Sequence, residues 1–423
     1  MRNTLLFTIT LVLAFSMSAC GKKKTADKKP SEANNAAMKA PGTPTEPAMA
    51  PEKTTGPEVK GGGAVCAVPE DNLIVKDTTF PKGCKLTVEQ NLEVDEGATL
   101  TIEAGARLAF KVDTGLHIKN GKLVARGTAA EPIVLTSANT TTAPGDWNGV
   151  VFDEEHLVGQ VLEFVTIEFA GHENYTGLQG GIIVYASQGD SRITLTSCTI
   201  RQNAKQGIIN LQEKGAFVKI ESTTFEKNGG TAMNVLAQLM GQVADSNKFD
   251  EKIIISGKIH RSVTFPKLAI PFFVDGSIDI GDDENPPTLT LPEGTVLRFK
   301  AETGIFVASE SAGALVARKV TFTSNLPTPK AGDWYGITLH EKTTGTSLEE
   351  CVIEFAGQAG PIGNGALVVE GDSVIPKNAK ATKLSIKSAE TAWSGPAAAC
   401  EELAKAEHGN TVDGKPFTCP KEE

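Results

Sequence analysis

The sequence predicts an all-β fold: a parallel β-solenoid of roughly thirteen coils in two homologous halves, after a disordered N-terminal tether. Two observations predict it. A block of about 187 residues is duplicated, and within each half short strands recur about every two dozen residues. No segment carries a helical stripe of comparable length.

The duplication is marked by two motifs. Gly-Asp-Trp-x-Gly occurs at residues 145–149 and 332–336, and Ile-Glu-Phe-Ala-Gly begins at Ile167 and at Ile353. The two tryptophans lie 187 residues apart and the two isoleucines 186. An offset that holds over a domain-sized block indicates a repeated architecture before it indicates any chemistry.

The shorter period sets the coil. The apolar anchors Ile167, Ile200, Phe225 and Phe249 lie 33, 25 and 24 residues apart, and apolar residues alternate with polar ones around them. Alternation with period two is typical of a half-buried strand. One coil cannot bury its inward side chains alone, so successive coils must stack. At about 24 residues a coil, residues 73–392 give roughly thirteen.

These residues carry a resemblance. The segments Glu-Gly-Ala-Thr-Leu-Thr-Ile-Glu-Ala-Gly (96–105) and Pro-Ile-Val-Leu-Thr-Ser (132–137), with the two duplicated motifs, resemble the right-handed parallel β-helix repeat proteins of the pectate-lyase-like superfamily, specifically its bacterial envelope lipoproteins. The resemblance covers most of residues 70–390. It implies a right-handed parallel β-helix and leaves the activity open, because lyases, hydrolases, adhesins and binding modules share this scaffold.

The N-terminus predicts the compartment. Arg2, the apolar residues 5–15 and Met-Ser-Ala-Cys at 17–20 resemble a bacterial lipoprotein signal whose lipobox ends at Cys20. An acylated, palmitate-bearing Cys20 would make the lipid bilayer a partner, with the protein anchored to it and not inserted through it. The alternative is an ordinary signal peptide with an incidental cysteine, since Met17 is unusual there. Gly21 is compatible with outer-membrane sorting, and the side that the protein faces stays open.

The predicted order of segments is therefore a signal peptide (1–20), a disordered Lys/Pro/Ala-rich tether (21–63), two β-helix halves (64–250 and 251–395) and a disulfide-closed cap (396–423). The tether holds six prolines, eight lysines, five acids and no aromatic residue, a composition that cannot bury enough apolar surface to fold. Its lysines either lie on anionic headgroups or form a solvated spacer.

Charge narrows the possible partners. Residues 64–423 hold 32 basic and 46 acidic residues, a net charge of −14. Such a surface does not attract nucleic acid. It equally disfavours anionic uronate polymers unless calcium bridges the two.

The cysteines form a pattern once Cys20 is set apart. In an envelope compartment Cys66 should pair with Cys84, and Cys400 with Cys419, each pair closing one end of the solenoid. Cys198 and Cys351 occupy the inward position that Val165 fills elsewhere. They are predicted to be buried free thiols.

The sequence supports no catalytic residue, no metal site and no cofactor beyond a weakly indicated Ca²⁺. Lyases on this fold need clustered acids for calcium and a basic residue, and inverting hydrolases need two spaced carboxylates. The outward acids that could serve are Glu163, Glu168, Glu221, Glu226, Glu349, Glu350 and Glu354. They do not form the Asp-rich sets of such enzymes. The segment Asp282-Asp283-Glu284 is interpreted as a solvated turn, and the histidines show no ligand spacing.

The best candidates for ligand binding are Asp146 and Trp147 with their counterparts Asp333 and Trp334, followed by Tyr175 in the insertion 172–180. The tryptophans could be platforms for sugar rings. Alternatively they cover a coil corner whose glycines permit a tight turn and whose aspartate bonds local amides. The equivalence of the copies favours the structural interpretation.

The sequence thus predicts a membrane-anchored envelope lipoprotein with a non-catalytic β-helix, a binding or structural module for polysaccharide or for another envelope protein. The alternative is a polysaccharide lyase or glycoside hydrolase on the same fold.

Overall fold

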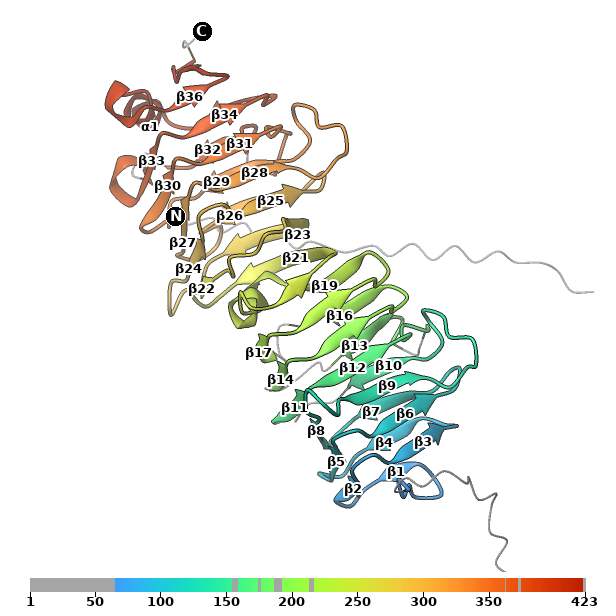
Figure 1. The fold of residues 1–423 in the computed structure, drawn as a ribbon. Coiled ribbons are helices and arrows are strands. Elements are labelled where there is room, and N and C mark those ends of the chain that lie inside the picture. The colour runs from blue at the N-terminus through green and yellow to red at the C-terminus, as the bar shows by residue number, and fades with distance from the viewer. Residues whose placement is uncertain are drawn as a thin grey trace, which may run out of the picture. The chain divides into compact units, whose positions relative to one another are not determined.

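The computed structural model describes residues 65–153, 159–173, 176–185, 192–212, 217–361, 363–371 and 374–420. All of them belong to one compact unit, Gly61–Glu423 (Figure 1). The predicted signal peptide and tether, with Cys20, lie outside the described residues. Among the described helices none combines the length and the apolar character that crossing a bilayer requires.

The described chain forms stacked coils, each with strands on three faces (Figure 1). One coil begins at each of β1, β4, β7, β10, β13, β16, β19, β21, β23, β26, β29, β32 and β35, which makes thirteen. The strands of successive coils pair in parallel, in one sheet of 19 strands and three of 7, 6 and 5. The predicted all-β parallel β-helix is confirmed.

In the first half each coil runs through face 1, face 2 and face 3 in turn. Face 1 holds β1 (Leu73–Ile74), β4 (Leu92–Val94), β7 (Gly115–Ile118), β10 (Gly149–Phe152), β13 (Gly180–Val184), β16 (Gln206–Asn210) and β19 (Thr231–Leu236). Face 2 holds β2 (Thr78–Phe80), β5 (Thr99–Glu103), β8 (Lys122–Arg126), β11 (Gln160–Glu163), β14 (Ile193–Thr196) and β17 (Phe217–Glu221). Face 3 holds β3 (Lys85–Val88), β6 (Arg107–Phe110), β9 (Ile133–Ser137), β12 (Val165–Glu168), β15 (Thr199–Arg201), β18 (Thr224–Glu226) and β20 (Lys248–Phe249).

The second half repeats this order after a junction made of η1 (Ala237–Gln242), β21 (Lys252–Ile259) and β23 (Phe272–Ile280). Its face 1 continues with β26 (Gly304–Val307), β29 (Gly336–Leu339), β32 (Leu367–Val369) and β35 (Trp393–Ser394). Face 2 holds β22 (Val263–Thr264), β24 (Thr288–Leu291), β27 (Ala314–Arg318), β30 (Thr346–Glu349) and β33 (Ala379–Thr382). Face 3 holds β25 (Val296–Phe299), β28 (Thr321–Ser324), β31 (Val352–Glu354), β34 (Ser385–Lys387) and β36 (Thr411–Val412).

The two halves are rotated against each other by one face. The last strand of face 1 in the first half is β19. The next strand in its column is β21, which pairs with β19 through Met233 and Ile253. The same column then passes through β23 into β25, which belongs to face 3 of the second half. Face 1 of the second half starts instead from the other ends of β21 and β23, beyond Gly257. Strand β10, which follows the first Gly-Asp-Trp-x-Gly motif, therefore lies in the same column as β31. Strand β29, which follows the second motif, lies in a different column.

Gly257 makes the shift possible. The pairing between β21 and β23 shifts register between Ile255 and Gly257, where Gly257 has φ +90°. A positive φ of this size is easy for glycine and strained for other residues. The chain therefore turns from one face to the next inside a single strand, without the corner loop of other coils.

The core is made of inward side chains that stack coil on coil. In the face 3 column the partners are Leu108, Leu135, Ile167, Ile200, Phe225 and Phe249. All but Phe249 are fully buried. Full burial of one such side chain contributes about 1.5–3 kcal/mol, so each coil is stabilised by the coils above and below it.

Single left-handed residues turn the chain between faces 2 and 3. The corner is a glycine at Gly83, Gly105 and Gly294. It is a non-glycine residue with φ near +50° at Phe164, Ser197, Ser222, Lys319, Glu350 and Lys383. Such residues cost about 1 kcal/mol each. The next residue points inward at every corner and includes both free thiols, Cys198 and Cys351.

Both ends are closed by disulfides with the predicted pairing. Cys66 bonds Cys84 with Cα atoms 5.4 Å apart, and Cys400 bonds Cys419 at 5.7 Å. At the C-terminal end, η2 (Val374–Asn378), α1 (Ala397–Leu403) and η3 (Ala406–His408) precede β36, and β37 (Lys415–Pro416) pairs with β36 antiparallel. Helix α1 lies within the predicted cap, residues 396–423.

Substituting Gly149 tests the close stacking of the coils. At Gly149 (φ +105°) a Cβ would lie 2.5 Å from the carbonyl oxygen of Gly180 in the next coil, whereas at Gly97 (φ +78°) it would meet nothing within 4 Å. We expect Gly97→Ala to lower the free energy of unfolding by about 1 kcal/mol through backbone strain alone. Gly149→Ala should cost ~2 kcal/mol more. Urea unfolding followed by circular dichroism measures both, and equal costs would contradict the close contact.

Candidate functional site

Both tryptophans of the Gly-Asp-Trp-x-Gly motifs are buried inside the solenoid. Trp147 and Trp334 have no exposed surface. Trp147 stacks on Phe110 with ring centroids 4.3 Å apart, and Trp334 stacks on Phe299 at 4.0 Å. Each indole Nε1 donates a hydrogen bond, of 2.8 Å to the carbonyl oxygen of Glu168 in one copy. In the second copy, Nε1 of Trp334 donates to the carbonyl oxygen of Glu354 at 2.9 Å. The hypothesis that these rings are platforms for sugars is wrong, because a platform needs an accessible ring face.

The aspartates of the motifs hold their own loops. One carboxylate oxygen of Asp146 accepts hydrogen bonds from Ser137 Oγ at 2.6 Å and from the Ala143 amide at 2.8 Å. Asp333 accepts in the same way from Ser324 Oγ at 2.6 Å and the Lys330 amide at 2.9 Å. These bonds tie the end of a face 3 strand to the loop that returns to face 1. The structure therefore supports the corner interpretation for both copies.

Two predicted residues lie outside the described residues: Tyr175, the candidate in the insertion, and Cys20, the lipidation site. Their roles stay predictions.

All seven outward acids considered for catalysis take part in ion pairs. The partner cations lie mostly one coil away, and the pairs are Glu163–Arg126, Glu168–Arg201, Glu221–Lys219, Glu226–Arg201, Glu349–Arg318, Glu350–Arg318 together with Lys383, and Glu354–Lys387. Surface pairs of this kind add little stability individually. Their effect here is positional, because six of the seven carboxylates are directed at a neighbouring coil and Glu221 is directed at Lys219 of its own strand.

Glu168 is the most constrained of these acids. Its side chain is 8% exposed, and its Oε2 accepts two hydrogen bonds from the guanidinium of Arg201, at 2.9 and 2.7 Å. Its Oε1 accepts from Thr136 Oγ1 at 2.9 Å. Its counterpart Glu354 repeats the contact to a threonine and has Lys387 at 3.9 Å. A carboxylate bound on both oxygens is a structural group.

Metal binding finds no support in the part of the chain that the structure describes. No group of three or more His, Cys, Asp or Glu residues is placed there to hold an ion. Asp282 Oδ1 instead accepts from the amides of Glu284 and Asn285, which lowers the pKa of Asp282. This is the local turn expected for the acidic loop. Calcium binding stays a prediction.

The free thiols are buried as predicted. Burial raises the pKa of Cys198 to about 12, and the thiol donates to the carbonyl oxygens of Leu162 and Thr196. Burial also raises the pKa of Cys351. Because the thiolate is the reactive form, neither cysteine is suited to nucleophilic or redox chemistry at neutral pH.

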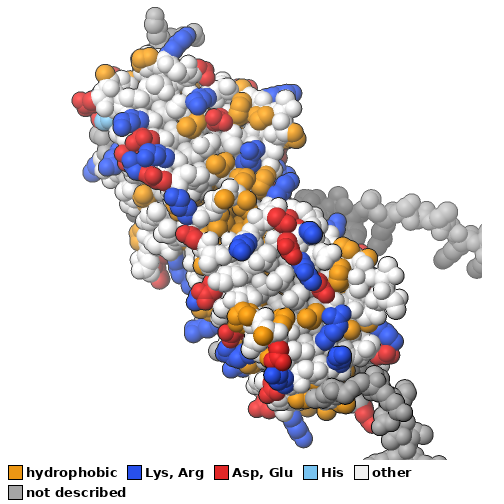
Figure 2. All heavy atoms as spheres, viewed as in Figure 1, with side chains coloured by type: hydrophobic (Ala, Val, Ile, Leu, Met, Phe, Trp, Pro, Cys, Tyr) orange, Lys and Arg blue, Asp and Glu red, His pale blue; other side chains and the backbone are white. Residues whose placement is uncertain are grey.

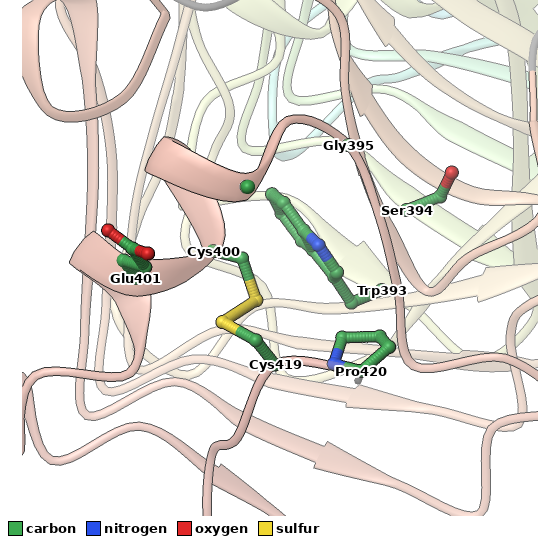
Figure 3. A pocket seen from close by; sticks show the side chains of 8 residues that line it. Trp393, Ser394, Gly395, Cys400, Glu401, Cys419 and Pro420 are labelled. Carbon is green, nitrogen blue, oxygen red and sulfur yellow. A yellow bond between two sulfur atoms is a disulfide. The ribbon is translucent and has the colours of Figure 1, made fainter. Parts of the chain in front are cut away.

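A cavity of about 460 Å³ opens at the C-terminal cap (Figure 3). Trp393 from β35 lies beside the Cys400–Cys419 disulfide and Pro420, while the carboxylate of Glu401 points away from the ring. Trp393 is 7% exposed and meets Phe417 edge to face.

Two further cavities lie where the halves meet. One, of about 360 Å³, is lined by β20 and by residues 267–270. The other, of about 340 Å³, is lined by Asp250, Glu251, Lys252 and the segment 270–273. Ile270 lines both. Figure 2 shows hydrophobic side chains gathered on the surface at this junction, over β21 and β23.

Glu251 is the unusual group of the junction. Its Oε2 accepts a hydrogen bond from Asn228 at 2.9 Å, while Oε1 is buried without a hydrogen-bond partner among the described residues. Burial raises the pKa of this carboxyl above its usual range. The predicted boundary between the halves falls at residues 250/251, beside this site, which was not predicted. Its signal was the loss of strict alternation in Ile253-Ile254-Ile255 and in Phe272-Phe273.

Comparison with known proteins supports the fold. The family model described as a pectate-lyase-like beta helix domain matches residues 72–173, the first coils of the first half. No curated protein and no solved structure matches the chain significantly. The matched family indicates a carbohydrate-related fold and names no residue of a site.

Truncating Trp147 separates the two interpretations of the motif. Trp147→Ala should lower the free energy of unfolding by about 3–5 kcal/mol, because it leaves a cavity beside Phe110. Leu326→Ala, at a side chain 43% exposed, should change it by less than about 0.5 kcal/mol. Chemical denaturation provides the measurement. A Trp147→Ala protein of unchanged stability would restore the platform hypothesis.

Proposed function

We propose that this protein is an envelope lipoprotein, anchored through an acylated Cys20, whose β-helix is a non-catalytic binding or structural module for polysaccharide. The proposal that the module is non-catalytic rests on the ion pairing of all seven outward acids. A general acid or base must reach the substrate and exchange a proton with it. A carboxylate directed at the cation of a neighbouring coil is poorly placed for either.

The polysaccharide part is supported by the fold. The matched family is pectate-lyase-like, and scaffolds of this kind carry binding modules as well as enzymes. Parallel strands present rows of outward polar side chains at a regular spacing of ~4.8 Å. Such rows suit a repetitive polymer better than a small ligand. The acidic surface favours neutral or cationic polymers, or anionic ones with calcium as a bridge.

Incubation of the full-length protein in detergent with a panel of immobilised neutral, cationic and anionic polysaccharides tests the binding function. We expect retention on at least one polymer without new reducing ends or unsaturated products, with and without calcium. The matched variants are Glu163→Gln, at an outward acid, and Glu284→Gln, in the acidic loop. Turnover that Glu163→Gln abolishes and Glu284→Gln preserves would establish the enzyme alternative and overturn the proposal.

Lipidation is tested separately. Cys20→Ser should abolish incorporation of labelled palmitate and move the protein from the membrane to the soluble fraction, because a thioether-linked anchor needs the sulfur. Lys22→Ala, two residues further on, should leave both unchanged. A membrane-bound, unlabelled wild-type protein would contradict the anchor while leaving the binding function intact.

A further inference from the structure

The rotation of the halves leaves a free sheet edge inside the molecule. The face 3 sheet of the first half has the order β3, β6, β9, β12, β15, β18, β20, and β20 is its last strand. Within the described residues β20 pairs only with β18, through Thr224–Lys248 and Phe225–Phe249. Unpaired strand edges are templates for further strands, and proteins usually cover them.

The chain passes over this edge without pairing to it. The Lys267 amide donates to Asp245 Oδ1 at 2.7 Å, and residues 267–270 then run above β20. A stacked strand would lie ~4.8 Å from β20 and leave no space between them. Instead residues of both segments line a cavity of about 360 Å³, and the residues that follow each of them, 250–252 and 270–273, line the second junction cavity of about 340 Å³.

The backbone of β20 directs its free groups into this space. In a parallel sheet the N–H and C=O groups of one residue point to the same side, and those of the next residue to the other. The Lys248 amide donates to Thr223 O at 2.9 Å and the Asp250 amide to Phe225 O at 3.3 Å, both toward the preceding coil. The N–H and C=O of Phe249 therefore face the cavity.

The inward ladder also ends here. The Phe249 ring stacks on Phe225 with centroids 4.9 Å apart and planes at 11°. Phe249 lines the cavity and is only partly buried, unlike the ladder members below it. Leu268 and Ile270 of the crossing segment pack against the core but are only partly buried. A further apolar side chain stacked on Phe249 would extend the core.

Charge adds a second requirement. Asp250 and Glu251 line the second cavity, while the nearby ammonium of Lys252 lies over the Phe273 ring, 5.1 Å from its centroid. Glu251 has a buried oxygen to which no group in the described part of the chain donates. A basic side chain entering here would supply that donor and complement both acids.

We propose that the junction is a peptide-docking groove, in which an extended segment of a partner protein adds to the free edge of β20 as a parallel strand. The segment carries an apolar residue that stacks on Phe249, followed by Arg or Lys over Asp250 and Glu251. Strand addition of this kind takes affinity from main-chain hydrogen bonds and specificity from alternate side chains. The groove is independent of the polysaccharide function proposed above.

The protein itself contains the model for such a segment. In β15 the sequence Thr-Ile-Arg stacks Ile200 on Phe225, while Arg201 reaches Glu226 at 3.9 Å. A peptide Ser-Val-Thr-Ile-Arg-Gln-Asn, taken from residues 197–203 with valine for the cysteine, would repeat both contacts one strand further on, at Phe249 and Asp250.

Fluorescence polarisation of this labelled peptide with the full-length protein tests the groove. We expect saturable binding, and at least tenfold weaker binding when glycine replaces the isoleucine, because glycine removes the side chain that would stack on Phe249. Hydrogen exchange of the Phe249 amide should slow on binding. Equal binding of both peptides, an unchanged Phe249 amide, or no binding at all would each overturn the proposal.

A charge swap localises the basic residue. Asp250→Lys should weaken binding of the peptide at least fivefold and strengthen binding of its Arg-to-Glu counterpart. Glu284→Lys, an exposed change of equal charge in the acidic loop, is the matched control and should do neither. Equal effects of the two variants would mean that bulk attraction and not this groove binds the peptide. Because no polysaccharide is present, failure here leaves the function proposed above untouched.

Discussion

The structure depends on one constraint, that each inward side chain must be covered by the equivalent side chain of the coil above and the coil below. A coil of about two dozen residues has no core of its own, and its strands find hydrogen-bond partners only in other coils. The ladder from Leu108 to Phe249 and the stacked pair of Phe110 and Trp147 are both products of this requirement. The sites where stacking stops, at the two caps and at the junction, are consequently the sites where the structure departs from its repeat.

The duplicated motifs are explained by the same constraint. Gly149 and Gly336 allow adjacent coils to approach, Asp146 and Asp333 fix the loops before them, and the tryptophans fill the core behind. Residue types that often form binding sites are here used to close a corner. Repetition of a motif is weak evidence for function in a solenoid, since every copy must solve the same packing problem.

Much of the fold could be predicted from the sequence because its determinants are local. Alternation around Ile167 and Ile200 specifies strands, and the cysteine spacings specify which pairs can bond at each end. The rotation between the halves could not be predicted. The rotation follows from Gly257 and from the pairing of β21 with two different columns. The offset of 187 residues does not reveal it, because the offset is the same whether or not the second half is rotated. The junction groove was missed for this reason, while the equivalence of the copies already favoured a structural role for Trp147 over sugar binding.

The rotation also changes what duplication means for this molecule. Had the halves been stacked in phase, one side would display the same pattern of side chains twice, and any ligand of one half could slide to the other. With the second half turned by one face, a partner lying along the coils meets two unlike surfaces in succession. The gene duplication has thus produced an asymmetric molecule from two similar parts, in which position along the axis can be distinguished.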